Sequence, residues 1–188
     1  ARYIGGEPGS IIKDPAAVDL RFAFCFPDLY EVGMSHLGMK ILYSLMNEKE
    51  NMWCERVFAP DIDFEEIMRS QGIPLYALES LDPLKNFDII GFTLQYELSF
   101  PTVLNMLDLA GLPVRAAERN KITPLIVAGG PCACNPEPLA DFIDLFLLGE
   151  GEEMNLELAE CLIQAKKEGL SKEEFLWRAA KIEGVYVP

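Results

Sequence analysis

The sequence has little of what several classes of site require. It contains one histidine, His36, and five cysteines, of which only Cys132 and Cys134 lie close together, as Cys-Ala-Cys. An odd number of scattered cysteines argues against a disulfide framework, and this set cannot complete a zinc site. No apolar run reaches the roughly 18 residues that span a bilayer, and the N-terminus does not resemble a signal peptide. We expect a cytoplasmic protein without a bound metal or a membrane anchor.

Positive charge is also scarce, because 16 Lys and Arg residues face 30 Asp and Glu residues, which gives a formal net charge of -14. A field of that sign repels phosphodiesters, so we expect no nucleic-acid binding by this domain. Hydrophobic residues make up 50% of the chain. That share is enough to bury a core without help from disulfides or metals.

The standard nucleotide-binding signatures are missing as well. Gly149-Glu150-Gly151 begins like a dinucleotide loop, but Met154 occupies the position of the third glycine. The acidic residues around this turn would repel a pyrophosphate, and no Walker sequence is present. The loop after the first predicted strand also lacks the Ser/Thr-rich cradle that flavin mononucleotide needs.

Short apolar runs alternate with helical patterns along most of the chain. Five strands are predicted at residues 21–26, 54–59, 87–94, 124–128 and 144–148, with a weaker one at 75–78. Helices are predicted at 36–49 with Ser35 as the cap, from Asp61 to about residue 71, at 99–110, at 152–168 and from Ser171 to about 181. This order predicts a doubly wound, mainly parallel five-stranded α/β sheet over residues 21–169. Residues 1–20 are expected to form an extended lead-in, and residues 170–188 a helix and the start of another strand.

In an open parallel sheet, ligands bind beyond the carboxyl ends of the strands. The loops at that edge are predicted at residues 27–35, 93–97, 129–138 and 149–153. Three of the four carry glycine, which lets the backbone approach a ligand closely, although glycine also ends strands for reasons of turn geometry alone. Asp28, Tyr30 and Glu31 either bind a polar ligand or are solvated. His36 is expected to be structural, although the sequence does not decide its role. The role of Cys132 and Cys134 is also left open.

Six stretches of these loops resemble one group of proteins. They are RYIGGE at 2–7, FPDLYEVGMSHLG at 26–38, LQYELS at 94–99, AGGPC at 128–132, NPEP at 135–138 and GEGEE at 149–153. Together they resemble the N-terminal domain of an uncharacterised bacterial family of radical S-adenosylmethionine proteins. The resemblance covers nearly the whole chain and implies a flavodoxin-like, cobalamin-binding-domain-like fold.

The resemblance also implies a larger parent protein. In such proteins a radical barrel follows the domain and holds a four-iron cluster on three cysteines spaced C-x3-C-x2-C, together with S-adenosylmethionine. This chain has no such triplet. The domain is therefore expected to be non-catalytic by itself, with the barrel of the same parent chain as its partner.

Cobalamin is the cofactor that the resemblance implies for this domain. The implied binding residues are Asp28, Tyr30, Gly33, Thr93, Gln95, Tyr96, Gly129, Gly130, Pro131, Gly149, Glu150 and Gly151. Gly129 and Gly130 match the Gly-Gly that lets the nucleotide tail pass, whereas Gln95 replaces the leucine of the Ser-x-Leu motif that Thr93 would begin. The Asp-x-His-x-x-Gly motif is absent, so cobalamin would bind without histidine ligation. The alternative is a degenerate domain without cofactor that serves as a docking or scaffold module.

Overall fold

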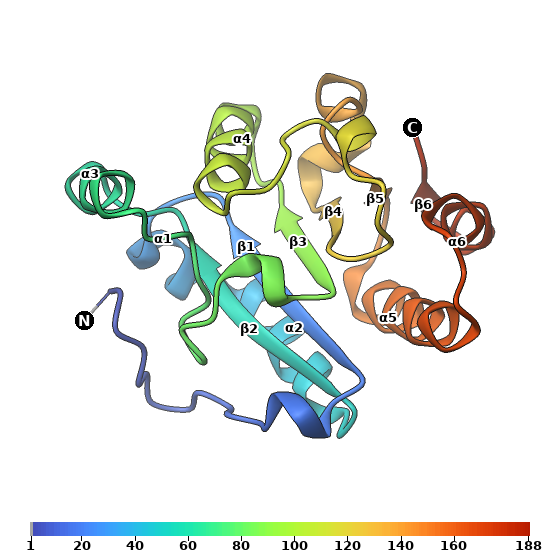
Figure 1. The fold of residues 1–188 in the computed structure, drawn as a ribbon, viewed down its shortest axis with the longest axis horizontal. Helices are drawn as coiled ribbons and strands as arrows, with labels where there is room; N and C mark the ends of the chain where they lie inside the picture. The colour runs from blue at the N-terminus through green and yellow to red at the C-terminus, as the bar shows by residue number, and fades with distance from the viewer. Residues whose placement is uncertain (1) are drawn as a thin grey trace.

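Six strands form one sheet in the computed structural model, which describes residues 2–188 (Figure 1). The strands are β1 (Leu20–Phe26), β2 (Met52–Phe58), β3 (Ile89–Thr93), β4 (Leu125–Gly129), β5 (Leu145–Leu147) and β6 (Val185–Tyr186). Their order across the sheet is β2-β1-β3-β4-β5-β6, and only β6 runs antiparallel to its neighbour. The predicted doubly wound α/β fold is confirmed. The order of the first five strands is the flavodoxin-like one.

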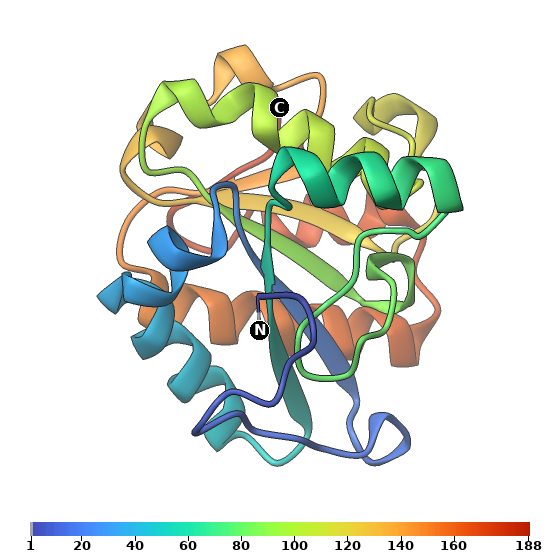
Figure 2. The same ribbon diagram turned by 90° about the vertical axis from the view of Figure 1, so that its left-hand side faces the viewer.

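Helices cover both faces of the sheet. They are α1 (Tyr30–Ser35), α2 (Leu37–Glu48), α3 (Ile62–Gln71), α4 (Phe100–Leu109), α5 (Gly151–Glu168) and α6 (Lys172–Ala179). Figure 2 shows α3 and α4 on one side of the strands and α2 and α5 on the other. Alternate residues of β1 divide between these layers, with Phe22 and Phe24 toward α2 and α5, and Ala23 and Cys25 toward α3 and α4. No helix within residues 2–188 is long and apolar enough to cross a membrane.

Local capping signals account for several helix boundaries. The Asp61 side chain accepts a hydrogen bond from the backbone N–H of Ile62, and Gly72 ends α3 with a left-handed φ of 66°. Ser171 and Glu174 form a reciprocal capping box at the start of α6. These boundaries agree with the caps and stops predicted from the sequence.

The structure corrects three predictions. The sheet has six strands rather than five, because β6 pairs with the exposed edge of β5. Residues 75–78 make no strand, and the isolated bridge there joins Tyr76 to Pro83. The cap of α2 is His36 rather than Ser35, since the preceding residues, predicted as a loop, form α1 and end at Ser35.

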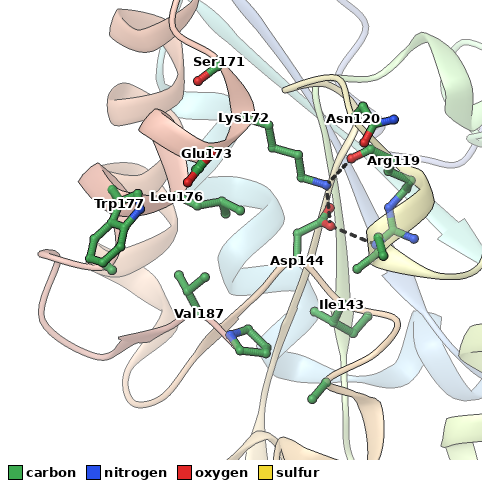
Figure 3. A pocket seen from close by; sticks show the side chains of 15 residues that line it. Arg119, Asn120, Ile143, Asp144, Ser171, Lys172, Glu173, Leu176, Trp177 and Val187 are labelled. Carbon is green, nitrogen blue, oxygen red and sulfur yellow. Dashed lines mark hydrogen bonds and ion pairs between the residues drawn. The ribbon is translucent and has the colours of Figure 1, made fainter.

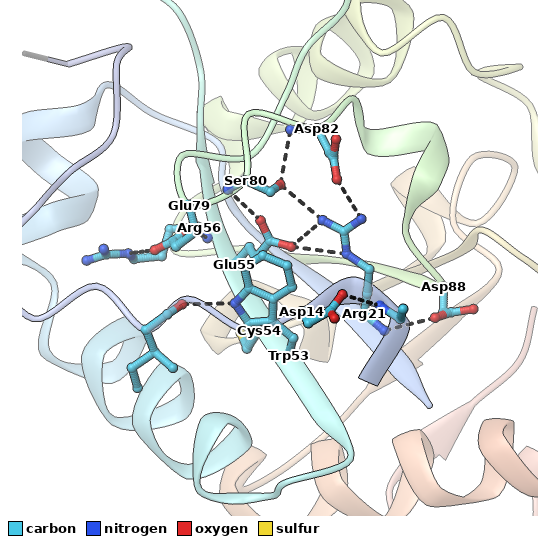
Figure 4. Close-up of polar contacts among 12 residues, drawn as sticks. Asp14, Arg21, Trp53, Cys54, Glu55, Arg56, Glu79, Ser80, Asp82 and Asp88 are labelled. Atoms are coloured by element: carbon cyan, nitrogen blue, oxygen red, sulfur yellow. Dashed lines mark hydrogen bonds and ion pairs between the residues drawn. The ribbon is translucent and has the colours of Figure 1, made fainter. Parts of the chain in front are cut away.

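Ion pairs from Arg21 of β1 to Asp82 and from Arg56 of β2 to Glu79 hold the segment around residues 75–88 against these strands (Figure 4). Arg21 Nη2 lies 2.5 Å from Oε1 of Glu55, and Arg21 Nη1 lies 2.7 Å from Oδ2 of Asp82. The other oxygen of Glu55 accepts a hydrogen bond from the backbone N–H of Ser80. This segment therefore bonds to side chains of the strands and has no ladder of its own, which explains why its apolar residues do not form a strand.

Candidate functional site

A cavity of about 260 Å³ opens at the carboxyl edge of the sheet, between the strands and the helices α2 and α5. The chain leaves β1 toward β2 on one side and leaves β3 toward β4 on the other, so the two central strands form a topological switch point. Open α/β sheets bind ligands at such points. We call this the strand-end cavity. It is lined by Phe22, Phe24, His36, Gly38, Leu42, Gly91, Phe92, Thr93, Gln95, Val127, Gly129, Gly130, Pro131, Leu147, Gly149, Gly151, Glu152 and Asn155.

The walls of the strand-end cavity are apolar and partly aromatic. The rings of Phe22 and Phe24 meet edge to face, with their centroids 6.3 Å apart. Val127 and Leu147 continue the same sheet face on β4 and β5, and Leu42 of α2 lies opposite. Such walls suit a flat apolar group.

The two glycines at the end of β4 differ in the space that the fold leaves for a side chain. A β-carbon on Gly129 would lie 3.6 Å from Leu147, which is ordinary contact. Gly130 has a φ of 96°, and a β-carbon there would lie 3.0 Å from the Leu94 carbonyl oxygen and 3.1 Å from Thr93 Oγ1. The fold itself therefore requires glycine at position 130. At position 129 a β-carbon would fit beside the cavity without a clash, whereas a larger side chain would extend into it.

One edge of the cavity is polar. His36 Nδ1 accepts a hydrogen bond of 3.2 Å from the backbone N–H of Met39, and His36 Nε2 lies 3.2 Å from Gln95 Oε1. Gln95 Nε2 in turn donates to Thr93 Oγ1 at 2.6 Å. The ring of His36 also packs against Phe26, with the centroids 5.2 Å apart. The histidine thus caps α2 and joins a chain of polar side chains at the cavity.

Seven of the twelve predicted site residues line the strand-end cavity. They are Thr93, Gln95, Gly129, Gly130, Pro131, Gly149 and Gly151. The structure therefore brings the ends of β3, β4 and β5 together in space, as their positions in the sequence predicted.

The other five predicted residues are not part of the lining. The Tyr96 hydroxyl donates to the carboxylate of Asp28, and the Tyr30 hydroxyl donates to the carboxylate of Glu7. Burial, followed by the Glu7 carboxylate, raises the pKa of Tyr30 to about 12. Gly33 is buried in α1, where a β-carbon would collide with the ring of Phe58. Glu150 is exposed and precedes α5.

The sequence interpretation missed the walls, namely Phe22, Phe24, Gly91, Val127 and Leu147. A signal for them exists in the two-residue repeat of a strand, which places side chains of alternate residues on one face. Counting back from Thr93 and Gly129 in steps of two reaches Gly91 and Val127. The position of His36 beside Gln95 has no such local signal, because 59 residues separate them.

A larger groove of about 770 Å³ lies at the opposite, amino edge of the sheet (Figure 3). Three of its charged side chains bind one another: Lys172 Nζ lies 2.7 Å and Arg119 Nη2 3.0 Å from Asp144 Oδ1. These contacts fasten α6 to the start of β5. Because its buried charges are paired and it faces away from the carboxyl ends, we assign it a structural role in spite of its size.

The described residues 2–188 contain no cluster of three or more His, Cys, Asp or Glu side chains that could hold a metal ion. Cys132 and Cys134 lie in the short 3-10 helix Pro131–Cys134 that follows Gly130. Burial and then the nearby Glu97 carboxylate raise the pKa of Cys132, which disfavours its reactive thiolate. Cys132 therefore lacks the environment of a reactive thiol.

Comparison with known proteins gives the family. Residues 38–188 match the family described as N-terminal domains of radical S-adenosylmethionine proteins. An uncharacterised protein of Methanocaldococcus jannaschii is 28% identical over 131 residues, which are 69% of this chain and 24% of that protein. The chain thus spans about a quarter of that relative's length, and no protein of solved structure matches it. The chain belongs to the family of radical S-adenosylmethionine N-terminal domains.

Proposed function

We propose that this domain binds a corrinoid, cobalamin, for a longer radical S-adenosylmethionine protein and that it has no catalytic activity by itself. The observation that carries the proposal is the strand-end cavity at the switch point of a flavodoxin-like sheet. The membership of the chain in this family supports a cofactor role within a larger protein. The radical barrel of the parent chain is the proposed partner.

The residues present fit part of such a cofactor. A volume of about 260 Å³ is slightly below the range of roughly 300–1,000 Å³ typical of complete small-molecule sites. It suits a ring system such as the nucleotide base and excludes a whole corrin. Phe22, Phe24 and Val127 would contact the base, and Gly129 would let the tail pass.

The chain's polar groups limit how the cofactor would be held. Both ring nitrogens of His36 already have partners, so this side chain is not free to ligate cobalt. Binding would therefore occur without histidine ligation. A bound cobalamin would supply organocobalt chemistry to the rest of the protein, whereas the residues of this domain would bind and orient it.

Titration with hydroxocobalamin tests the proposal. We expect the corrin absorption bands to shift on binding and the melting temperature of the protein to rise with cobalamin concentration. Gly129→Val should weaken binding by about tenfold or more, because its methyl groups would occupy the cavity. Ala117→Val, which adds bulk at the larger groove, is the matched control and should bind normally. Unchanged bands and melting temperature at high micromolar cobalamin would refute the proposal.

Exposed apolar residues at the same edge favour a second candidate, a docking module without cofactor. Leu37 at the start of α2 is 70% exposed, and Leu98 between β3 and α4 is 85% exposed. This candidate expects Leu98→Asp to weaken association with the radical barrel of the parent protein, and Gly129→Val to leave it intact. Loss of cobalamin binding in Gly129→Val, with binding retained in Leu98→Asp, would decide for the first candidate.

A further inference from the structure

The chain of polar side chains at the strand-end cavity has a defined direction. It starts at the backbone N–H of Met39, which can only donate, so Nδ1 of His36 must accept and carries no proton. A neutral imidazole then has its proton on Nε2, and that N–H donates to Oε1 of Gln95. This oxygen assignment turns the Gln95 amide nitrogen toward Thr93 Oγ1, which accepts.

The direction of this series of hydrogen bonds leaves the proton of the Thr93 hydroxyl without an acceptor among residues 2–188. Within residues 2–188 the Thr93 hydroxyl donates no hydrogen bond, although the side chain lines the cavity and the residue is only 8% exposed. Its oxygen lies beside Gly130, at the point where a β-carbon would come within 3.1 Å. A nearly buried hydroxyl gains most from an acceptor supplied by whatever fills the cavity.

We infer that His36 and Gln95 are positioning residues that hold the Thr93 hydroxyl as a hydrogen-bond donor toward the strand-end cavity. The occupant must then present an acceptor atom, such as an unprotonated ring nitrogen or a carbonyl oxygen, next to Gly130. This inference rests on the proposed function for the existence of an occupant. The tautomer of His36 is a separate consequence, and it can be tested without any ligand.

His36 is the only histidine in the sequence, which makes the first experiment unambiguous. A long-range ¹H–¹⁵N correlation spectrum of the labelled protein at neutral pH separates protonated from unprotonated ring nitrogens. We expect a proton on Nε2 and none on Nδ1. In Gln95→Met, which has similar length but accepts no comparable hydrogen bond, the Nε2 signals should move. A proton on Nδ1, or on both nitrogens, would overturn the inference whether or not cobalamin binds.

The second experiment measures cobalamin binding by variants of the same chain. Thr93→Val removes the donor with little change of shape and should weaken binding about three- to tenfold, whereas Thr93→Ser keeps the hydroxyl and should bind nearly normally. Gln95→Met should weaken binding by a smaller factor. The double variant should be no worse than Thr93→Val, because Gln95 acts through the threonine.

The outcomes separate the two ideas. If the wild type binds no cobalamin, the proposed function fails, while the spectrum of His36 still decides the direction of the polar chain. If the wild type binds and Thr93→Val binds equally well, the proposed function stands and the inference about the donor is wrong. Additive losses in the double variant would show that Gln95 contacts the ligand itself and does not position the threonine.

Discussion

The ring of Phe22 on β1 occupies the space that a side chain at Gly91 on the neighbouring strand β3 would need. A β-carbon on Gly91 would be 2.6 Å from the ζ carbon of that ring, well inside contact distance. Gly91 therefore leaves the space that the end of the Phe22 ring occupies in the wall of the strand-end cavity. Gly129, two strands away from Phe22 and on the same cavity, makes no comparable contact.

This difference predicts opposite results for two equal substitutions. Gly91→Ala should lower the free energy of unfolding by about 1–3 kcal/mol, because the Phe22 ring must shift. Gly129→Ala adds a methyl group at ordinary contact distance from Leu147, at the end of β4, and should be neutral or stabilising by up to about 1 kcal/mol. Chemical denaturation of both variants measures the two values. Equal losses of stability in the two variants would mean that other side chains already fill the space beside Gly129.

The cap of α2 leads to a second prediction. His36→Ala removes the acceptor of the Met39 N–H and should lower the free energy of unfolding by about 1 kcal/mol. Ser35→Ala is the control, since the Ser35 hydroxyl donates to the Val32 carbonyl at an exposed site and caps nothing in α2. It should change stability by about 0.5 kcal/mol or less. A larger loss of stability for Ser35→Ala than for His36→Ala would mean that Ser35 caps α2, as the sequence alone predicts.

Much of the fold could be predicted because its signals are local. Asp61, Gly72 and Ser171 act on the backbone next to them, and uninterrupted apolar runs identify strands that are covered on both faces. The segment 75–78 failed because its conformation depends on distant partners. Its neighbours Ser80 and Asp82 bond to Glu55 and Arg21, which no local pattern links to them.

The candidate site shows the same division. Glycines at strand ends identified Gly129, Gly130, Gly149 and Gly151, because turns at the carboxyl edge leave a compositional trace. The contact of His36 with Gln95 could not be predicted, since it requires β1 and β3 to be neighbours while the sequence places β2 between them. Strand order is decided by packing of the whole sheet.

Removal of the cation from the buried ion pair between Arg21 and Glu55 should make the stability of the protein depend on pH. Burial raises the pKa of Glu55, and the hydrogen bonds from Ser80 and Arg21 oppose that rise. Arg21→Met keeps apolar contact with Trp53 and Phe87 but leaves the carboxylate without its cation. We expect a loss of about 3–5 kcal/mol near pH 8.

The loss in Arg21→Met should shrink on acidification. Without the cation the folded-state pKa of Glu55 rises further above its unfolded value of about 4.3. The folded protein then binds the proton more tightly than the unfolded chain, so stability recovers as the pH falls toward 5. Arg115→Met is the control, because Arg115 and Asp141 form an exposed pair, and it should cost about 1 kcal/mol or less at either pH. A loss for Arg21→Met that is independent of pH would contradict this assignment.

The thiols should differ strongly in reactivity. Burial raises the pKa of Cys25 and Cys54 well above that of a free thiol, and it also raises the pKa of Cys132. Cys134 is exposed. Because the thiolate is the reacting species, a disulfide reagent at pH 8 should modify Cys134 first in the native protein, and Cys134→Ser should abolish the fast phase. All five cysteines should react together in denaturant. Equal fast rates for Cys132 and Cys134 would instead indicate a reactive pair beside the strand-end cavity, and would make redox chemistry at this edge the better hypothesis.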